Sequence, residues 1–205
     1  MNLIIEQMKQ CGVVFEAGLT DSAIGEIEKL YDIQFPQSLR DFYSCALPVS
    51  YYDPAWEGFE MGREIFPVWN DFSDDNVQMI RQWINRPAEM LLLSVEHGFW
   101  RGSWGEKPLD AEKAKEICTS RLADAPKMIP VYLHRHIPQL AGVADPPVIS
   151  AVGQDIVYYG RNLRDYLVRE FLEDNSPRQQ LQNCLNVPFW SDIINGNVPL
   201  WRDMI

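Results

Sequence analysis

The sequence predicts a soluble α+β domain. Segments with helical spacing of apolar residues alternate with short apolar strand segments along the 205 residues. There is no internal repeat, low-complexity tract or interdomain linker. A hydrophobic content of 46% over this length is enough for one well-buried core. One domain of mixed helices and strands is therefore expected.

Three helices are expected in the first fifty residues. The first ends at Gly12, Thr20 is a suitable N-cap for the second, and Pro36 begins the third, which Pro48 closes. In each helix, apolar residues recur at three- and four-residue spacing and define a buried face. These faces are Leu3, Ile4, Met8 and Cys11; Ile24, Ile27, Leu30 and Tyr31; and Leu39, Phe42, Tyr43 and Ala46.

The middle of the chain is expected to hold a helix, a strand and a second helix. Ser73 or Asp74 can cap the first helix, which should stop at Arg86-Pro87, because the residue before a proline disfavours helix. The apolar run LLLSV at 91–95 predicts a buried strand. A charged helix follows from Asp110 to about Leu122.

Three strands and a last helix are expected after residue 125. The strand segments are IPVYL (129–133), VISAV (148–152) and DIVYY (155–159), the last two joined by a Gly153-Gln154 hairpin turn. Asn162 can cap the helix that follows.

Negative charge is concentrated in the first half of the chain. The formal net charge is −11, and residues 1–100 hold 16 Asp and Glu against 6 Lys and Arg. Such a field repels nucleic-acid phosphates and attracts basic proteins. The densest part predicts a partner-binding surface, although a merely solubilising face accounts for the same charges. Its candidate residues are Asp53, Trp56, Glu57, Glu60, Glu64, Asp71, Asp74 and Asp75.

Catalytic, metal and nucleotide signatures are absent from the sequence. His134 and His136 lie two residues apart and would share one face of a strand, but no third metal ligand lies nearby. There is no G-x-S-x-G nucleophile motif, P-loop or G-x-G-x-x-G. Paired carboxylates of the glycosidase kind stay open, because sequence spacing does not give separation in space. We expect no cofactor, no metal and no enzymatic activity.

The tryptophans and histidines leave one rival hypothesis. Trp100, Trp104, His134 and Arg135 could line a cleft for a small ligand or a reaction. The simpler interpretation places Trp69, Trp100 and Trp104 in the core, and folds Trp190 and Trp201 back onto the domain.

The remaining sequence features concern the cellular compartment. No secretory signal and no apolar stretch long enough to span a membrane is present, which predicts a cytoplasmic protein. Cys11, Cys45, Cys118 and Cys184 form no C-x-x-C pair and are expected to be buried free thiols.

Five segments follow one another along the chain, namely IGEIEKLYDIQFPQSLRDFYSCALPV, FPVWNDF, WRGSWGEKP, APKMIPVYLHRHIP and PPVISAVGQDIVYYGRNLRDYLVREF. In this order they resemble the SUKH superfamily, and more narrowly the bacterial Smi/Knr-type proteins, whose yeast relatives are linked to regulation of cell-wall synthesis. The resemblance covers residues 19–172, with 1–18 as an N-terminal helical extension and 173–205 as a C-terminal tail docked on the domain.

The resemblance implies a central, mainly antiparallel sheet flanked by helices in a single domain. It also implies a role that many bacterial members have, as immunity proteins that bind and neutralise toxins, and we expect this role for the chain. We therefore expect a protein-binding module whose partner is a basic toxin domain, with no nucleic acid and no membrane as partner. Regulatory scaffolding, as in the yeast relatives, remains the alternative role.

Overall fold

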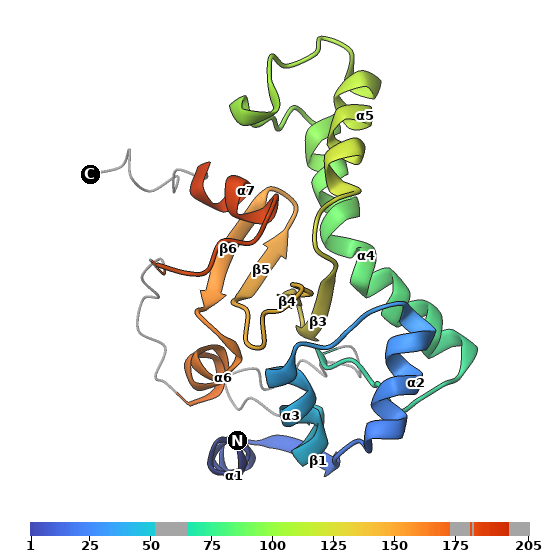
Figure 1. Cartoon of the computed structure of the whole chain (residues 1–205), viewed down its shortest axis with the longest axis vertical. Helices are drawn as coiled ribbons and strands as arrows, with labels where there is room; N and C mark the ends of the chain where they lie inside the picture. The colour runs from blue at the N-terminus through green and yellow to red at the C-terminus, as the bar shows by residue number, and fades with distance from the viewer. Residues whose placement is uncertain (52–64, 173–180, 182, 197–205) are drawn as a thin grey trace, which may run out of the picture.

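The computed structural model describes residues 1–51, 65–172, 181 and 183–196 and has an α+β architecture with two antiparallel sheets (Figure 1). The predicted α+β class is confirmed, with the strands divided between the two sheets. The small sheet pairs β1 (Val13–Ala17) with β2 (Ala46–Tyr51). The larger has the order β3 (Met128–Tyr132), β4 (Arg135–Pro138), β5 (Val148–Val152) and β6 (Asp155–Gly160).

Helices surround both sheets. In Figure 1 the long helix α4 runs past the β3 edge of the larger sheet and continues beyond it beside α5. None of the helices in the described ranges is long and apolar enough to cross a membrane. The helices are α1 (Asn2–Gln10), α2 (Asp21–Tyr31), α3 (Gln37–Cys45), α4 (Asp74–Glu96), the short 3₁₀ helix η3 (Gly102–Trp104), α5 (Ala111–Leu122), α6 (Leu163–Phe171) and α7 (Trp190–Gly196).

Several local predictions are confirmed by hydrogen bonds at the element ends. The Thr20 hydroxyl accepts a hydrogen bond from the backbone N–H of Ala23 at 3.2 Å. The Asn162 side chain likewise accepts from the backbone N–H of Asp165 at 2.8 Å. These caps satisfy N–H groups that the first helical turn leaves without partners. The expected β5–β6 hairpin also forms, and Gly153 adopts the positive φ of 58° that its turn requires.

The predicted strand at 91–95 and the predicted helix end at Pro87 are both wrong, because α4 continues through the proline to Glu96. Leu91 and Val95 are buried one helical turn apart, whereas Leu93 between them is 46% exposed. A short apolar run fits a strand and a buried helix face equally well, so the pattern alone could not decide.

Tertiary contacts compensate for Pro87. A proline has no N–H, so the Trp83 carbonyl loses its donor within the helix. The His136 Nε2 atom lies 3.4 Å from that carbonyl, inside the protein. The Trp83 indole in turn donates to the Leu133 carbonyl at 2.7 Å, in the turn that joins β3 to β4. The β3–β4 hairpin therefore holds α4 where the proline weakens it.

The small sheet was not predicted. Pro48 lies inside β2 instead of only ending the third helix, and Phe15 of β1 pairs with it next to an irregularity in the register. Pro48 is tolerated because a two-stranded sheet leaves each strand one side without ladder hydrogen bonds. Residues 1–18 consequently contain the strand β1 as well as the helix α1.

The buried apolar residues form two clusters. The larger joins α1, α2, α3, α6 and the beginning of α4 to strands of both sheets, and includes Ile4, Ile24 and Trp69. The smaller lies between α4, α5, β5 and α7, where Trp104 and Trp190 are buried. The expected core position of Trp69 and Trp104 is thus correct, and Trp100 packs partly buried against the smaller cluster. Trp201 lies outside the described residues.

The cysteines differ from the expectation in part. Cys118 is buried, but Cys11 and Cys45 are exposed. Each exposed cysteine stands at the end of a helix, where its side chain falls outside the buried face.

Two glycines offer a matched test of this packing. A Cβ on Gly18 would stand 2.0 Å from the Ser44 carbonyl oxygen, whereas a Cβ on Gly25 in α2 would meet nothing within 4 Å. We expect Gly18→Ala to lower the free energy of unfolding by about 2 to 4 kcal/mol, because backbone must move. Gly25→Ala should raise it by roughly 0.5 to 1 kcal/mol through helix propensity. Urea denaturation measures both, and equal midpoints would contradict the close approach.

Candidate functional site

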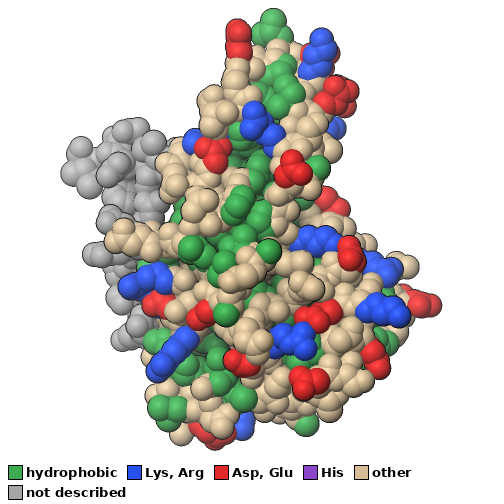
Figure 2. Space-filling view, in the orientation of Figure 1, with side chains coloured by type: hydrophobic (Ala, Val, Ile, Leu, Met, Phe, Trp, Pro, Cys, Tyr) green, Lys and Arg blue, Asp and Glu red, His purple; other side chains and the backbone are tan. Residues whose placement is uncertain are grey.

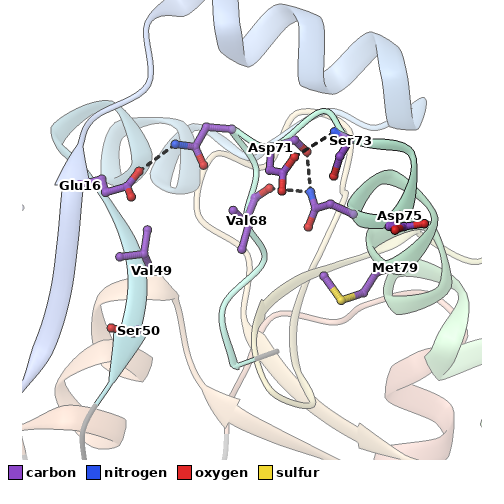
Figure 3. Close-up of a pocket in the computed structure, with 10 residues that line it drawn as sticks. Glu16, Val49, Ser50, Val68, Asp71, Ser73, Asp75 and Met79 are labelled. Carbon is purple, nitrogen blue, oxygen red and sulfur yellow. Dashed lines mark hydrogen bonds between the residues drawn. The ribbon is translucent and has the colours of Figure 1, made fainter. Parts of the chain in front are cut away.

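An open hollow of about 880 Å³ lies between the small sheet and the beginning of α4 (Figure 3). We call it the acidic groove. Three carboxylates reach it from three different parts of the chain, namely β1, the loop before α4 and the first turn of α4. Its lining residues are Glu16, Val49, Ser50, Val68, Asn70, Asp71, Ser73, Asp75, Asn76 and Met79.

The loop that forms one wall of the groove is held by a buried amide. Asn76 is only 6% exposed, and its side-chain nitrogen donates to the Val68 carbonyl at 2.9 Å and to the Asp71 carbonyl at 2.5 Å. The Asp71 carboxylate accepts from the backbone N–H of Ser73 at 2.9 Å, which closes the turn into α4. Figure 3 shows these bonds converging on the loop.

Trp69 anchors the same loop from below. Its ring is fully buried and packs edge-on against Tyr31 and Phe35, with centroid separations of 5.6 and 5.1 Å. Because its neighbour Val68 lines the groove, this wall is attached directly to the larger apolar cluster. This wall of the groove is therefore packed directly on the core.

The opposite wall comes from the small sheet. Val49 and Ser50 of β2 line it, and the Asn70 side chain donates to the Glu16 carboxylate of β1 at 2.9 Å. This bond links the two walls across one end of the groove (Figure 3). Glu16 keeps a second carboxylate oxygen for another partner.

The charge of the groove has one sign. The lining in the described part of the chain includes Glu16, Asp71 and Asp75 but no Lys or Arg. Asp74 and Asp75 lie in the first turn of α4, where the helix dipole stabilises carboxylates without any partner. The helix dipole does not account for the carboxylate of Glu16, which lies on a β-strand. The groove is suited to a cationic group.

The predicted partner-binding residues are placed only in part. Asp71 and Asp75 line the groove, and Asp74 is exposed on the same helical turn as Asp75. The others, Asp53, Trp56, Glu57, Glu60 and Glu64, lie outside the described residues. Sequence reasoning missed Glu16 and Asn76. Nothing in the sequence joins Glu16 to the loop before α4, because the unexpected small sheet brings them together.

The members of the rival cleft contact different parts of the fold. Trp104 stacks on Phe189, with ring centroids 5.9 Å apart, and the Trp100 indole donates to the Gly105 carbonyl at 2.9 Å. The His134 carbonyl instead accepts from the backbone N–H of Ala151 in β5. These contacts serve packing and strand pairing.

Arg135 makes an internal ion pair. It is 7% exposed, its guanidinium lies 3.6 Å from the centroid of the Tyr159 ring, and its Nε atom lies 3.6 Å from a Glu170 carboxylate oxygen. Its Nη1 atom donates to the Ser150 hydroxyl at 3.2 Å. A buried arginine needs such partners. Arg135 thus joins β4, β5, β6 and α6.

The two histidines beside Arg135 have different surroundings. His134 lies in the turn before β4 and is partly exposed, whereas His136 is fully buried. Besides the Trp83 carbonyl, the His136 ring approaches the His134 carbonyl, 3.2 Å from Nδ1. Within residues 1–51, 65–172, 181 and 183–196, no three His, Cys, Asp or Glu side chains gather as metal ligands.

Comparisons with protein-family models, curated proteins and solved structures return no significant match for this chain. The resemblance to the SUKH superfamily accordingly stays a prediction. The functional argument rests on the geometry and charge of the acidic groove.

His136 makes the stability of the fold depend on pH. Its pKa is lowered from 6.5 to about 4, chiefly by burial; the charges of His134 and Arg86 act in the same direction, and the hydrogen bonds to the Trp83 and His134 backbone oppose the shift. Because the folded-state pKa lies below the unfolded one, the stabilisation is complete above pH 6.5 and is lost as the pH falls toward 4. We expect the free energy of unfolding to fall by roughly 2 kcal/mol across this window.

Denaturation at a series of pH values checks this expectation. His136→Gln should be less stable at neutral pH and should show a smaller pH dependence between 6.5 and 4. His97→Gln is the matched control, because it makes the same substitution at an exposed residue that follows α4. An identical profile for His136→Gln and the wild type would contradict the role of His136.

Proposed function

We propose that this chain is a non-enzymatic protein-binding module that acts as an immunity protein, neutralising a basic toxin domain in the cytoplasm. One observation carries the proposal. The acidic groove presents Glu16, Asp71 and Asp75 from three separate segments with no lining Lys or Arg among the described residues. The arrangement offers negative charge to a protruding cationic group.

Charge complementarity supports a basic protein as the partner. Toxin nucleases need positive clefts to bind phosphate, so an acidic surface can dock on such a cleft and block it. The same negative field disfavours nucleic acid as a direct ligand. The acidic residues at 53–64 add charge of the same sign to the chain between β2 and the groove loop.

The way in which the groove carboxylates are held also favours partner binding over a merely solubilising role. Solubilising carboxylates stand apart in water, whereas Glu16 is held by Asn70, and Asp71 by the N–H of Ser73. Orienting these carboxylates before binding reduces the entropy lost on association. Trp69 and Asn76 hold the loop that forms one wall of the groove, so the partner meets a preformed surface there.

Co-expression tests the proposed role. The reading frame directly upstream of this gene is expressed alone and together with this chain. The proposal expects growth arrest from the upstream product alone and recovery when this chain is present. Arrest that this chain does not relieve, or no arrest at all, would overturn the immunity role.

Charge reversal in the groove tests the surface. Glu16→Lys combined with Asp75→Lys should slow association with the purified upstream product by about tenfold at low salt and flatten its salt dependence, because electrostatic steering is lost. Stopped-flow or surface-binding kinetics measure the rate. Asp124→Lys is the control, since Asp124 is exposed after α5, away from the groove. An unchanged association rate in the double variant would exclude this surface.

A further inference from the structure

A second hollow continues the acidic groove along α4, and Met79 lines both. The second hollow has a volume of about 390 Å³. Its lining residues are Met79, Gln82, Trp83, Arg86 and Glu89. Met79 is half-buried, so part of its side chain stays open to solvent where the two hollows meet. A flexible thioether side chain adapts to partners of different shape.

The acidic groove is not uniformly polar. Val49 and Val68 join Met79 as apolar lining, while Glu16, Asp71 and Asp75 supply the carboxylates. Figure 3 shows Met79 on α4 beside Asp75, and Val49 and Val68 on the facing segments. An occupant therefore meets an apolar surface and negative charge within the same hollow.

We propose that the groove recognises an exposed basic segment of the partner that carries one aliphatic side chain between Lys or Arg residues. The aliphatic side chain packs on Met79, and the flanking cations face Glu16, Asp71 and Asp75. This inference rests on the proposed function and specifies what the groove selects. Apolar burial supplies affinity that salt does not screen, while the charges direct the segment into the groove.

The sign of the lining decides which kind of segment the groove attracts. Glu16, Asp71 and Asp75 are accompanied by no Lys or Arg among the described lining residues. These carboxylates repel an acidic segment and attract a cationic segment of another molecule.

Labelled peptides test the selectivity directly. One short peptide of Lys and Gly residues has a single central Leu, a second has Ser at that place, and a third replaces every Lys of the first by Glu. Fluorescence anisotropy at low salt should show the Leu peptide binding about five- to tenfold more tightly than the Ser peptide, since a buried side chain is added. The Glu peptide should not bind.

Variants at Met79 assign the effect to the groove. Met79→Gln should remove the preference for Leu over Ser, whereas Met79→Leu should retain it because the apolar volume is kept. Leu93→Ala is the matched control on the same helix, since Leu93 is exposed beyond the groove. Circular dichroism and the urea midpoint of each variant establish that it is folded.

The outcomes separate this inference from the proposed function. Equal binding of the Leu and Ser peptides, or an unchanged preference in Met79→Gln, would overturn the aliphatic contact. If the co-expression rescue still depends on Glu16 and Asp75, the immunity role stands without it. Failure of the Lys peptides to bind at all also overturns the inference, and the immunity role is then judged by the rescue alone.

Discussion

The fold depends on the attachment of α4 to the β3–β4 hairpin. Trp83 donates to the Leu133 carbonyl, and the buried His136 ring faces the carbonyl that Pro87 deprives of its helical donor. These contacts let one helix run through a proline without ending. Its first half then forms a wall of the acidic groove, and its second half covers the smaller apolar cluster. The groove wall and the cover of the smaller cluster are therefore parts of the same helix.

The groove shows how a polar surface is fixed by an apolar interior. Trp69 is buried among aromatic rings, and the residues on either side of it, Val68 and Asn70, line the groove. Asn76 then satisfies two carbonyls of the same loop from α4. A buried amide with its hydrogen bonds made is stable, while removing it would take one donor from each of these two carbonyls. The carboxylates are thus carried on a framework that resists displacement.

Arg135 is also held in place by its surroundings, but its partners enclose it inside the fold and do not present it on a surface. Arginine, histidine and tryptophan, the residue types at positions 135, 134, 100 and 104, often form active sites. Here Arg135 is enclosed by Tyr159, Ser150 and Glu170, and Trp104 is buried against Phe189. Their chemistry is used to join strands and helices. Residue type alone therefore does not show which of these side chains is used for packing inside the fold.

The sequence by itself determined the α+β class, the caps at Thr20 and Asn162 and the β5–β6 hairpin, because these depend on contacts between near neighbours in the chain. It also located two of the groove carboxylates, Asp71 and Asp75. Only the tertiary structure decided that α4 crosses Pro87 and that Glu16 joins the groove. Each of these needs a partner at least 50 residues away in the chain: His136 and Leu133 for α4, and Asn70 for Glu16. The local sequence pattern does not predict such distant pairings, because they form only when the core brings the segments together.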